Sequence, residues 1–469
     1  MGSEKNNISR RKFITTASTT AAAFTIVPRH VLGGPAGTPP SEKLNIAVIG
    51  CGGQGRNNIR GLLGHKDVQI TAIADPTESA NYDRFYYKGF AGRAPVKDLL
   101  EKHYQKSNPA YKCPAYSDFR TLFDKEKNNF DAVLCATPDH WHAYISITAM
   151  KNGKGIYCEK PLAHNIWEAR QVAKVAAETK VATQMGNQGR SSVGHPMMRE
   201  WLADGAIGTV KQVKAWTGAK GHIHHAGRPD KAMEVPAGLD WEMWVGPRQM
   251  RPYNIEYTPY TWRNWWDFGS GITGDMAIHH FDSAWTYLNP GTPTWIEGTT
   301  ENLNSETASQ NNRVTWMYEK DGKPLKFSWY DGKHRPERPE ELEERRRMGG
   351  NGVLVIGEKG KIMGGGWSAP PRIIPETKMQ AYELPPKTLK RSKGHHRNWI
   401  NACKNGGPTV SNFDYAARLT EFVILGNLAI RAGKRINWDA KNMKVKGMPQ
   451  LDPIIREEYV PQWDLQKLL

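Results

Sequence analysis

The sequence predicts an α/β protein with two structural parts. From Lys43 to about Leu162, short apolar strands alternate with helical segments, as they do in βαβ units. After about residue 205, short strands follow one another and only a few helices interrupt them. We therefore expect a doubly wound parallel sheet, followed by an α+β domain with an open, mostly antiparallel sheet.

The elements follow from these patterns. In the first part we expect strands at residues 45–50, 68–74, 132–136, 155–158 and 182–185, and helices at 55–63, 118–124, 142–152 and 167–179. Residues 81–111 are rich in Tyr, Lys and Arg, and we interpret them as an insertion after the second strand. In the second part we expect strands at 210–217, 294–300, 314–318, 325–330, 352–357 and 361–363. Helices at 274–288 and 395–403 interrupt this sheet, and a third helix spans 415–432.

The composition is that of a globular protein that is large enough for two or three cores. The 469 residues are 39% hydrophobic and 24% charged, and 64 basic against 47 acidic residues give a net charge of +17. The basic residues are scattered, and the densest charged run, residues 335–347, mixes both signs. We expect that run to be a solvated loop or short helix. We expect no nucleic-acid partner, whereas attraction to acidic glycans or to a membrane surface stays an alternative.

Five cysteines occur without a CxxC pair or a metal-ligand spacing: Cys51, Cys113, Cys135, Cys158 and Cys403. Three of them lie in or beside expected buried strands, where cysteine behaves as a small apolar residue. We expect no disulfide framework and no metal site.

The first 42 residues have the pattern of a targeting signal. Ser9-Arg10-Arg11-Lys12-Phe13-Ile14 precedes an uncharged, weakly hydrophobic stretch that ends at Pro28, and residues 33–40 form a Gly/Pro-rich linker. Twin arginines in this setting resemble a twin-arginine export signal, which implies a periplasmic protein; a disordered basic tail is the alternative. The stretch is too short and too polar to span a membrane. We therefore divide the chain into a signal and linker (1–42), a nucleotide-binding domain (43–165) and a C-terminal substrate and oligomerisation domain (166–469).

A glycine-rich loop follows the first expected strand. It reads Gly50-Cys51-Gly52-Gly53-Gln54-Gly55, and Asp75 ends the second strand. The first glycine permits a sharp turn, Gly52 lets the backbone approach a pyrophosphate, and Gly55 lets the helix pack close to the strand. Asp75 can accept hydrogen bonds from a ribose and repels a 2′-phosphate. This arrangement predicts a Rossmann domain that binds NAD, although Asp75 followed by Pro76 does not exclude NADP.

Three further motifs extend this interpretation. They are Cys135-Ala136-Thr137-Pro138-Asp139-His140-Trp141-His142, Cys158-Glu159-Lys160-Pro161-Leu162 and Gly274-Asp275-Met276-Ala277-Ile278-His279-His280-Phe281-Asp282. With the glycine loop, this ordered set resembles the glucose–fructose oxidoreductase / inositol dehydrogenase / rhizopine-catabolism (Gfo/Idh/MocA) family. The resemblance spans about residues 43–290, and the Glu-Lys-Pro tripeptide is its most specific element.

The candidate catalytic residues make chemical sense on their own. Lys160 ends a parallel strand, where open α/β sheets bind ligands, and it can stabilise a developing alkoxide. We expect burial or positive charge to lower its pKa. Asp275 and His279 share one helix face, so the carboxylate can orient an imidazole that takes a proton, although such a pair is also common as a structural contact. The resemblance implies that Lys160, Asp275 and His279 form the catalytic group, with His279 as general base.

The resemblance also implies cofactor and substrate contacts. It places Thr137, Pro138 and His142 at the cofactor, Glu159 and Lys160 near the nicotinamide, and Asn187 and Gln188 between nicotinamide and substrate. Aromatic residues before the Asp275 helix suit a carbohydrate, because aromatic rings stack on sugars, but tryptophans are also common in cores. The candidate substrate residues are therefore Trp262, Arg263, Trp266 and His280, in addition to Asn187 and Gln188. We interpret His222, His224 and His225 as part of a loop near the site rather than as metal ligands.

The predicted function is that of an NAD-dependent oxidoreductase that acts on a hydroxyl of a sugar or glycoside. Export implies a tightly bound cofactor that a second sugar or an acceptor protein reoxidises, because a free NAD pool is absent outside the cytoplasm. The alternative is a redox-neutral, NAD-dependent glycoside hydrolase that uses oxidation and elimination, and a non-catalytic sugar sensor is a third class. The resemblance further implies a homo-oligomer.

Overall fold

A computed structural model describes residues 42–219 and 227–469 of the chain, and Leu44–Leu469 form one compact unit. The predicted export signal lies outside the described residues, as do His222, His224 and His225. Within the described ranges, no helix combines the length and the apolar character that a membrane span needs.

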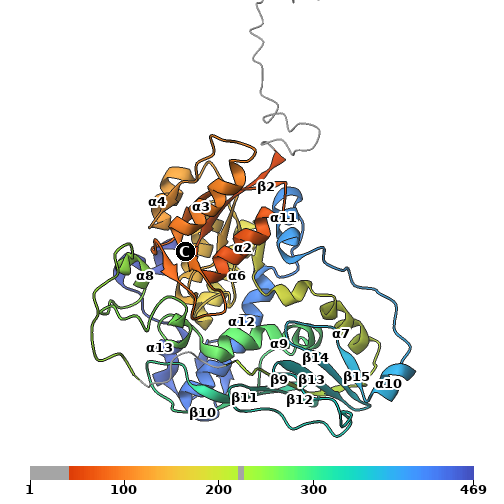
Figure 1. The fold of residues 1–469 in the computed structure, drawn as a ribbon. Helices are drawn as coiled ribbons and strands as arrows, with labels where there is room; N and C mark the ends of the chain where they lie inside the picture. The colour runs from red at the N-terminus through yellow and green to blue at the C-terminus, as the bar shows by residue number, and fades with distance from the viewer. Residues whose placement is uncertain (1–41, 220–226) are drawn as a thin grey trace, which may run out of the picture. The chain divides into compact units, whose positions relative to one another are not determined.

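The N-terminal sheet has six parallel strands in the order β5-β2-β1-β6-β7-β8, with helices packed against it (Figure 1). In this doubly wound order the chain starts in the middle of the sheet and winds outward in both directions, as in the Rossmann fold. The predicted fold class is therefore confirmed for this part. The strands are β1 (Leu44–Ile49), β2 (Val68–Ala74), β5 (Ala115–Tyr116), β6 (Ala132–Cys135), β7 (Gly155–Cys158) and β8 (Thr183–Met185), and the helices are α2 (Gly53–Leu63), α3 (Arg93–Tyr104), α4 (Phe119–Glu126), α5 (His142–Lys151) and α6 (Ile166–Thr179).

Two expectations for this part need correction. Residues 81–111 are not only an insertion, because they contain α3, the helix that connects β2 to the edge strand β5. The sequence pattern does not indicate β5, because it has only two residues. The sheet also continues past residue 165, where we placed the end of the nucleotide-binding domain, because β8 pairs with β7.

The C-terminal sheet has seven strands in the order β10-β11-β12-β9-β13-β14-β15. All neighbours are antiparallel except β9 and β12, so the predicted open, mostly antiparallel sheet is also confirmed. The strands are β9 (Val210–Trp216), β10 (Trp295–Glu301), β11 (Gln310–Lys320), β12 (Lys323–Tyr330), β13 (Gly352–Gly357), β14 (Lys361–Gly365) and β15 (Arg372–Ile374). The main helices are α7 (Gly194–Ala203), α9 (Gly271–Leu288), α10 (Glu376–Ala381), α11 (His395–Asn405) and α12 (Phe413–Ala432), and shorter elements are β3 (Ala80–Asn81), β4 (Phe90–Ala91), α8 (Trp241–Val245), α13 (Asp452–Ile455), β16 (Trp438–Asp439) and β17 (Lys444–Val445).

Two long helices join the sheets. Helix α12 packs against α6 of the first part, against α9 and against β10, and α9 packs against β9 (Figure 1). Both helices are buried along most of their length, which explains why their sequences are apolar on nearly every face.

Helix α11 does not interrupt the C-terminal sheet, contrary to our expectation. It packs on the nucleotide-binding domain, where Trp399 and Ile400 are fully buried in the same core cluster as residues of β1 and β2. Arg397 donates two hydrogen bonds of 2.8 and 2.9 Å to Asp67 and so ties the helix to the start of β2. Sequence patterns could not assign this helix, because they do not show which layer an amphipathic helix covers.

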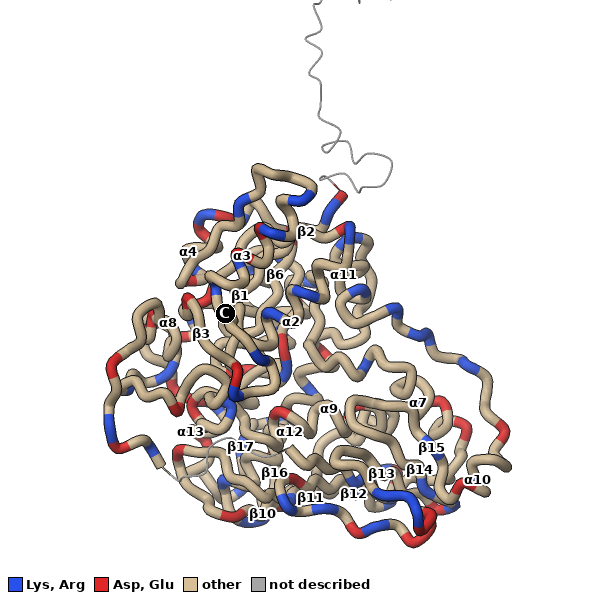
Figure 2. The backbone as a smooth tube through the Cα atoms, in the orientation of Figure 1, with Lys and Arg blue, Asp and Glu red and all other residues tan. Residues whose placement is uncertain are grey.

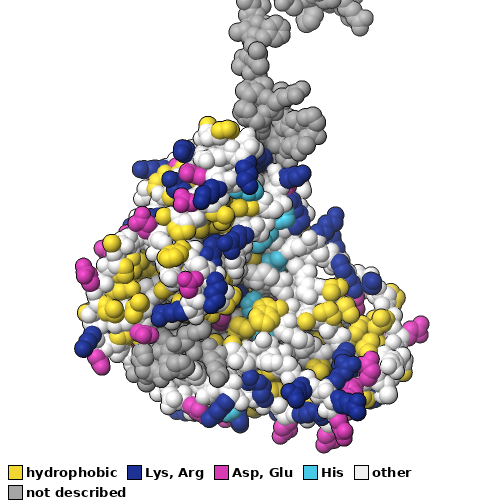
Figure 3. All heavy atoms as spheres, in the orientation of Figure 1, with side chains coloured by type: hydrophobic (Ala, Val, Ile, Leu, Met, Phe, Trp, Pro, Cys, Tyr) yellow, Lys and Arg dark blue, Asp and Glu magenta, His cyan; other side chains and the backbone are white. Residues whose placement is uncertain are grey.

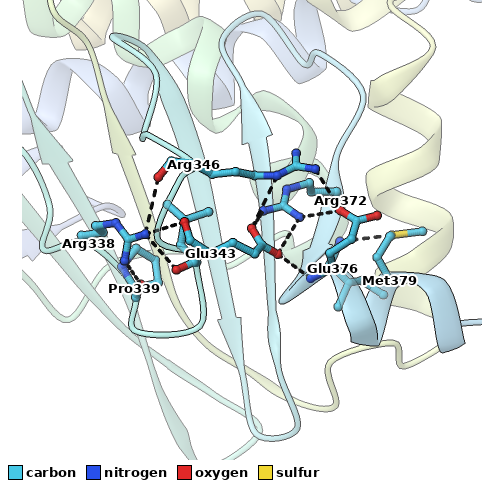
Figure 4. A network of polar contacts seen from close by, with 9 residues as sticks. Arg338, Pro339, Glu343, Arg346, Arg372, Glu376 and Met379 are labelled. Carbon is cyan, nitrogen blue, oxygen red and sulfur yellow. Dashed lines mark hydrogen bonds and ion pairs between the residues drawn. The ribbon is translucent and has the colours of Figure 1, made fainter.

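The charged run at residues 335–347 crosses the face of the sheet that is opposite α9 and α12. Its Leu342 is buried with Trp216, Leu354 and Ile374. Glu343 accepts hydrogen bonds from both terminal guanidinium nitrogens of Arg372, at 2.6 and 3.2 Å, which links the run to β15 (Figure 4). Elsewhere Lys and Arg are interspersed with Asp and Glu over both parts of the fold (Figure 2).

Candidate active site

A cavity of about 660 Å³ lies where the strands of the parallel sheet end and α9 begins. Ligands bind at this edge of open α/β sheets because successive loops diverge there. The cavity is lined by predicted residues from both parts of the chain: Gly50, Gly52, Gly53, Gln54, Asp75, Thr137, Pro138, Glu159, Lys160, Gln188, Trp262, Arg263, Asp275 and His279. Its size falls in the range of about 300–1,000 Å³ that is usual for small-molecule and cofactor sites.

The glycine loop forms one end of the cavity. Gly50 has a φ of +93°, which a residue with a side chain rarely adopts, and a Cβ on Gly55 would overlap the carbonyl oxygen of Gly50. These two glycines allow α2 to start directly behind β1, so that the N–H groups of its first turn face the cavity. The loop therefore fits a dinucleotide.

Asp75 stands beside this loop at the end of β2. Its carboxylate accepts hydrogen bonds from the backbone N–H groups of Cys51 (2.6 Å) and Thr77 (2.7 Å). Burial raises the pKa of Asp75, and these two bonds oppose that shift. The carboxylate is thereby held at the cavity wall, where the predicted ribose contact requires it.

The hairpin of β3 and β4 (residues 80–91), called the tyrosine hairpin below, packs against the glycine loop. We did not assign it to the site from the sequence. Tyr82, Tyr86 and Tyr87 line the cavity, and the Tyr82 hydroxyl would lie 2.8 Å from a Cβ on Gly52. Arg56 of α2 holds the hairpin by donating hydrogen bonds to the carbonyl oxygens of Tyr87 (2.5 Å) and Phe90 (2.6 Å). The unusual concentration of tyrosines in residues 82–87 was the available signal.

Lys160 and Asp275 form a direct ion pair inside the cavity, with side chains that are 15% and 20% exposed. Burial opposes the charge on Lys160, but the charge and the hydrogen bond of Asp275, together with the charge of Glu159, raise the pKa of the lysine. This corrects our expectation of a lowered pKa. Burial also opposes the charge on Asp275, but Lys160 and Arg263 lower the pKa of this carboxyl to about 2. Both groups are therefore charged at neutral pH.

His279 lies one helical turn beyond Asp275 on the same face of α9 and is 4% exposed. Burial, with the positive charge of Lys160, lowers the pKa of His279 well below its ordinary value of 6.5. Its Nδ1 has no hydrogen-bond partner among the described residues. The ring is therefore a neutral imidazole in the cavity wall, and a neutral imidazole can accept a proton.

Five predicted site residues are not among the residues that line the cavity: Gly55, His142, Asn187, Trp266 and His280. Asn187 is fully buried behind it, between Asp282 (2.9 Å) and Ser411 (2.6 Å). Trp266 is 5% exposed and packs under Arg431 at 5.1 Å.

His280 is about 140° round α9 from Asp275, so it points away from that residue. It packs between Trp329 and Trp367, at centroid distances of 5.9 and 5.2 Å. Burial lowers its pKa to about 3, so this ring is neutral.

His142 connects the carboxyl ends of two strands instead of lining the cavity. Its ring nitrogens lie 2.6 Å from the carbonyl oxygen of Pro161 and 3.0 Å from that of Thr137. Folding also brings its ring within 4.8 Å of the sulfurs of Cys135 and Cys158, a proximity that the sequence spacing does not indicate. Because both ring nitrogens already face backbone oxygens, we assign His142 to the support of the Thr137 and Lys160 loops.

The predicted Gln188, Trp262 and Arg263 do line the cavity, and Trp367, which the sequence analysis did not assign, joins them. Gln188 donates a 3.1 Å hydrogen bond to Glu159, the residue before Lys160. The Arg263 guanidinium lies 4.4 and 4.2 Å from the ring centroids of Tyr260 and Trp262. In Figure 3, hydrophobic and histidine side chains lie together in the hollow at the centre of the view.

The fold and the cavity together define a dinucleotide-binding protein. Residues 44–187 match the family model "Oxidoreductase family, NAD-binding Rossmann fold", and residues 198–465 match "Oxidoreductase family, C-terminal alpha/beta domain". The chain belongs to the Gfo/Idh/MocA family, and its N-terminal domain is an NAD-binding domain.

Known relatives are similar to this chain over part of their length. An inositol 2-dehydrogenase of Rubrobacter xylanophilus is 26% identical over 178 residues, which are 38% of this chain and 44% of that protein. An α-N-acetylgalactosaminidase of Shewanella oneidensis is 24% identical over 231 residues, 49% of this chain and 40% of that protein. The chain thus spans less than half of the length of the curated relatives it matches.

Solved structures share the fold. The WlbA dehydrogenase of Bordetella pertussis, in complex with NADH and UDP-GlcNAcA, superposes with a TM-score of 0.54 at 17% identity. The match covers 85% of this chain and 99% of that chain, so it includes both the nucleotide-binding and the C-terminal domain.

Proposed function

We propose that this protein oxidises a hydroxyl group of a sugar or glycoside with NAD as the hydride acceptor. The observation that carries the proposal is the group formed by Lys160, Asp275 and His279, which lies in the same cavity as the glycine loop and Asp75. Relatives that are named inositol 2-dehydrogenase and levoglucosan dehydrogenase support a cyclic polyol or sugar as substrate.

The charge states of this group assign the roles. Lys160 is a cation at neutral pH because Asp275 raises its pKa, so it donates a hydrogen bond to the substrate oxygen and stabilises the negative charge that develops there. His279 is neutral and takes the hydroxyl proton. Asp275 holds the ammonium group of Lys160 in place. NAD, when bound, supplies the hydride acceptor.

Redox-neutral glycoside cleavage is the second candidate. The similarity to a protein named α-N-acetylgalactosaminidase favours it. In this reaction, oxidation of the C3 hydroxyl would make the C2–H acidic, elimination across C1 and C2 would expel the aglycone, water would add at C1, and the C3 ketone would be reduced again by the NADH formed in the first step. The same His279 and Lys160 would manage the protons, so the catalytic group alone does not distinguish the two reactions.

We also propose that the protein is exported with its cofactor already bound and that it acts in the periplasm as a homo-oligomer. The twin-arginine pattern at Arg10 and Arg11 supports export of a folded protein. The tyrosine hairpin over the glycine loop supports retention of the dinucleotide, because Tyr82 and Tyr87 pack against the loop that holds it.

The first experiment is an assay of the nicotinamide content of the purified protein, followed by absorbance measurements of NADH with a panel of sugars and glycosides. We expect Lys160→Ala to abolish NADH formation, whereas Lys151→Ala, at the exposed end of α5, leaves it unchanged. Unchanged turnover in Lys160→Ala would refute the proposal. Release of an aglycone without net NADH would instead establish the redox-neutral reaction.

A further inference from the structure

Trp367 is unusual among the tryptophans of the described residues. It lies in the turn between β14 and β15 and is 42% exposed, and no other tryptophan is among the exposed large hydrophobic side chains of the described ranges. Burial of an indole is favourable, so an exposed one is informative when it borders a cavity. Trp367 lines the same cavity as Lys160 and His279.

The indole lies beside the proposed general base. The ring centroids of Trp367 and His279 are 5.8 Å apart with an interplanar angle of 41°. His280 packs beside the indole at 5.2 Å, and Trp329 packs beside His280 at 5.9 Å, so the indole adjoins a row of tilted rings that reaches into the core. A substrate whose hydroxyl approaches His279 therefore comes within reach of the indole.

The backbone holds Trp367 in a conformation that side-chain-bearing residues rarely adopt. Trp367 has a φ of +54° and Ser368 a φ of +51°, both in the left-handed region. Such strain persists only where the surroundings enforce it, and it is common at functional sites.

Close packing enforces this turn. A Cβ on Gly189 would lie 2.7 Å from the carbonyl carbon of Trp367, and Ser192 donates a 2.8 Å hydrogen bond to the carbonyl oxygen of Ser368. A Cβ on Gly366 would lie 2.5 Å from His280. These contacts hold the turn in the conformation that places the indole at the cavity.

We propose that Trp367 is a carbohydrate-stacking platform, on which the C–H face of a pyranose or cyclitol ring lies while one of its hydroxyl groups faces His279. The inference rests on the proposed function and names the shape of its substrate: a closed ring with an apolar face rather than an open-chain polyol. A flat aromatic surface binds such a ring at low entropic cost, because the indole has few rotatable bonds. Trp367 then determines affinity and orientation, while Lys160 and His279 carry the chemistry.

The test measures binding by titration calorimetry on the NAD-loaded protein. The ring probes are methyl α-D-glucopyranoside, methyl N-acetyl-α-D-galactosaminide and myo-inositol, and sorbitol is the open-chain probe. We expect Trp367→Ala and Trp367→Gly to weaken the best ring probe at least tenfold, and Trp367→Phe to restore most of the loss. Binding of sorbitol should change less than twofold. Trp295→Ala is the matched control, because this tryptophan lies on the edge strand β10 beside Arg435, at 3.9 Å.

Thermal unfolding separates a binding role from a structural one. Trp367→Gly removes the packing of the indole but accommodates the positive φ, so we expect its Tm to stay close to that of the wild type while ring binding is lost. Ring binding that no Trp367 substitution changes would overturn the inference and leave the proposed function standing. Ring binding that depends on Trp367 without hydride transfer would support the platform and overturn the reaction. Failure of the wild type to bind any ring probe would overturn both.

Discussion

Asp275 and Asp282 lie on the same helix, and we expect the first to serve catalysis and the second to serve stability. Asp275 faces the cavity and pairs with Lys160, whereas Asp282, two turns further along α9, is buried against Arg190 at 2.8 Å. Asp282 also accepts hydrogen bonds from Asn187 (2.9 Å) and Tyr415. We expect Asp275→Asn to remove activity and Asp282→Asn to remove stability.

The magnitudes follow from burial. Asp282 and Arg190 have side chains that are 2% and 11% exposed, and removing one partner of a buried pair costs about 3–5 kcal/mol. With an unfolding entropy of about 2.1 cal/mol/K per residue, a chain of 469 residues loses roughly 1 °C of Tm for each kcal/mol, so we expect a fall of about 3–5 °C. Lys160 and Asp275 are more exposed, at 15% and 20%, so Asp275→Asn costs less Tm.

We also expect the two substitutions, Asp275→Asn and Asp282→Asn, to differ in their effect on kcat. In Asp275→Asn, burial and Arg263 act on Lys160 without the carboxylate, so its pKa falls and the alkaline limb of activity moves to lower pH. Loss of this positioning should lower kcat about 10²–10⁴-fold. Calorimetry and initial rates of NADH formation test both variants. If kcat, corrected for the folded fraction, falls as far in Asp282→Asn as in Asp275→Asn, the assignment of Asp275 to catalysis and of Asp282 to stability is refuted.

Three further predictions concern the base, the cofactor and the fold. Because protonation inactivates a base and burial lowers the pKa of His279, we expect the acid limb of kcat/KM to have its midpoint below pH 6.5, and a midpoint above 6.5 would exclude His279 as the base. Asp75→Ser should raise the affinity for NADPH relative to NADH at least tenfold in fluorescence titrations. Asp98→Asn, which changes an exposed acid on α3, is the control and should leave this affinity ratio unchanged. An unaltered affinity ratio in Asp75→Ser would show that Asp75 does not select the cofactor. Trp399→Ala should cost about 3–5 kcal/mol in denaturant unfolding, because this fully buried indole docks α11 on the parallel sheet, and a loss below about 1 kcal/mol would contradict that docking.

The sequence predicted those parts of the site that are carried by local patterns. Gly50, Gly55 and Asp75 lie within one strand–turn–helix–strand unit, so their spacing alone defines the nucleotide loop. Lys160 and His279 were predicted by motif. Asn187 was assigned to the substrate by the family resemblance, and Trp266 and His280 from their neighbourhood in the chain, and the structure places all three outside the cavity lining. Adjacent residues on a helix or loop point in different directions, and proximity in sequence does not show which of them faces a cavity.

By itself, the sequence determined the α/β fold class, the NAD-binding loop and the family, because strand periodicity, glycine spacing and short motifs act over a few residues. Only the tertiary structure decided the electrostatics and the walls of the site. The pKa of Lys160 depends on Asp275, more than a hundred residues away, and the cavity is completed by the tyrosine hairpin and by Trp367. Such contacts depend on how layers pack, and the balance between burial and charge at Lys160 exists only once both are in place.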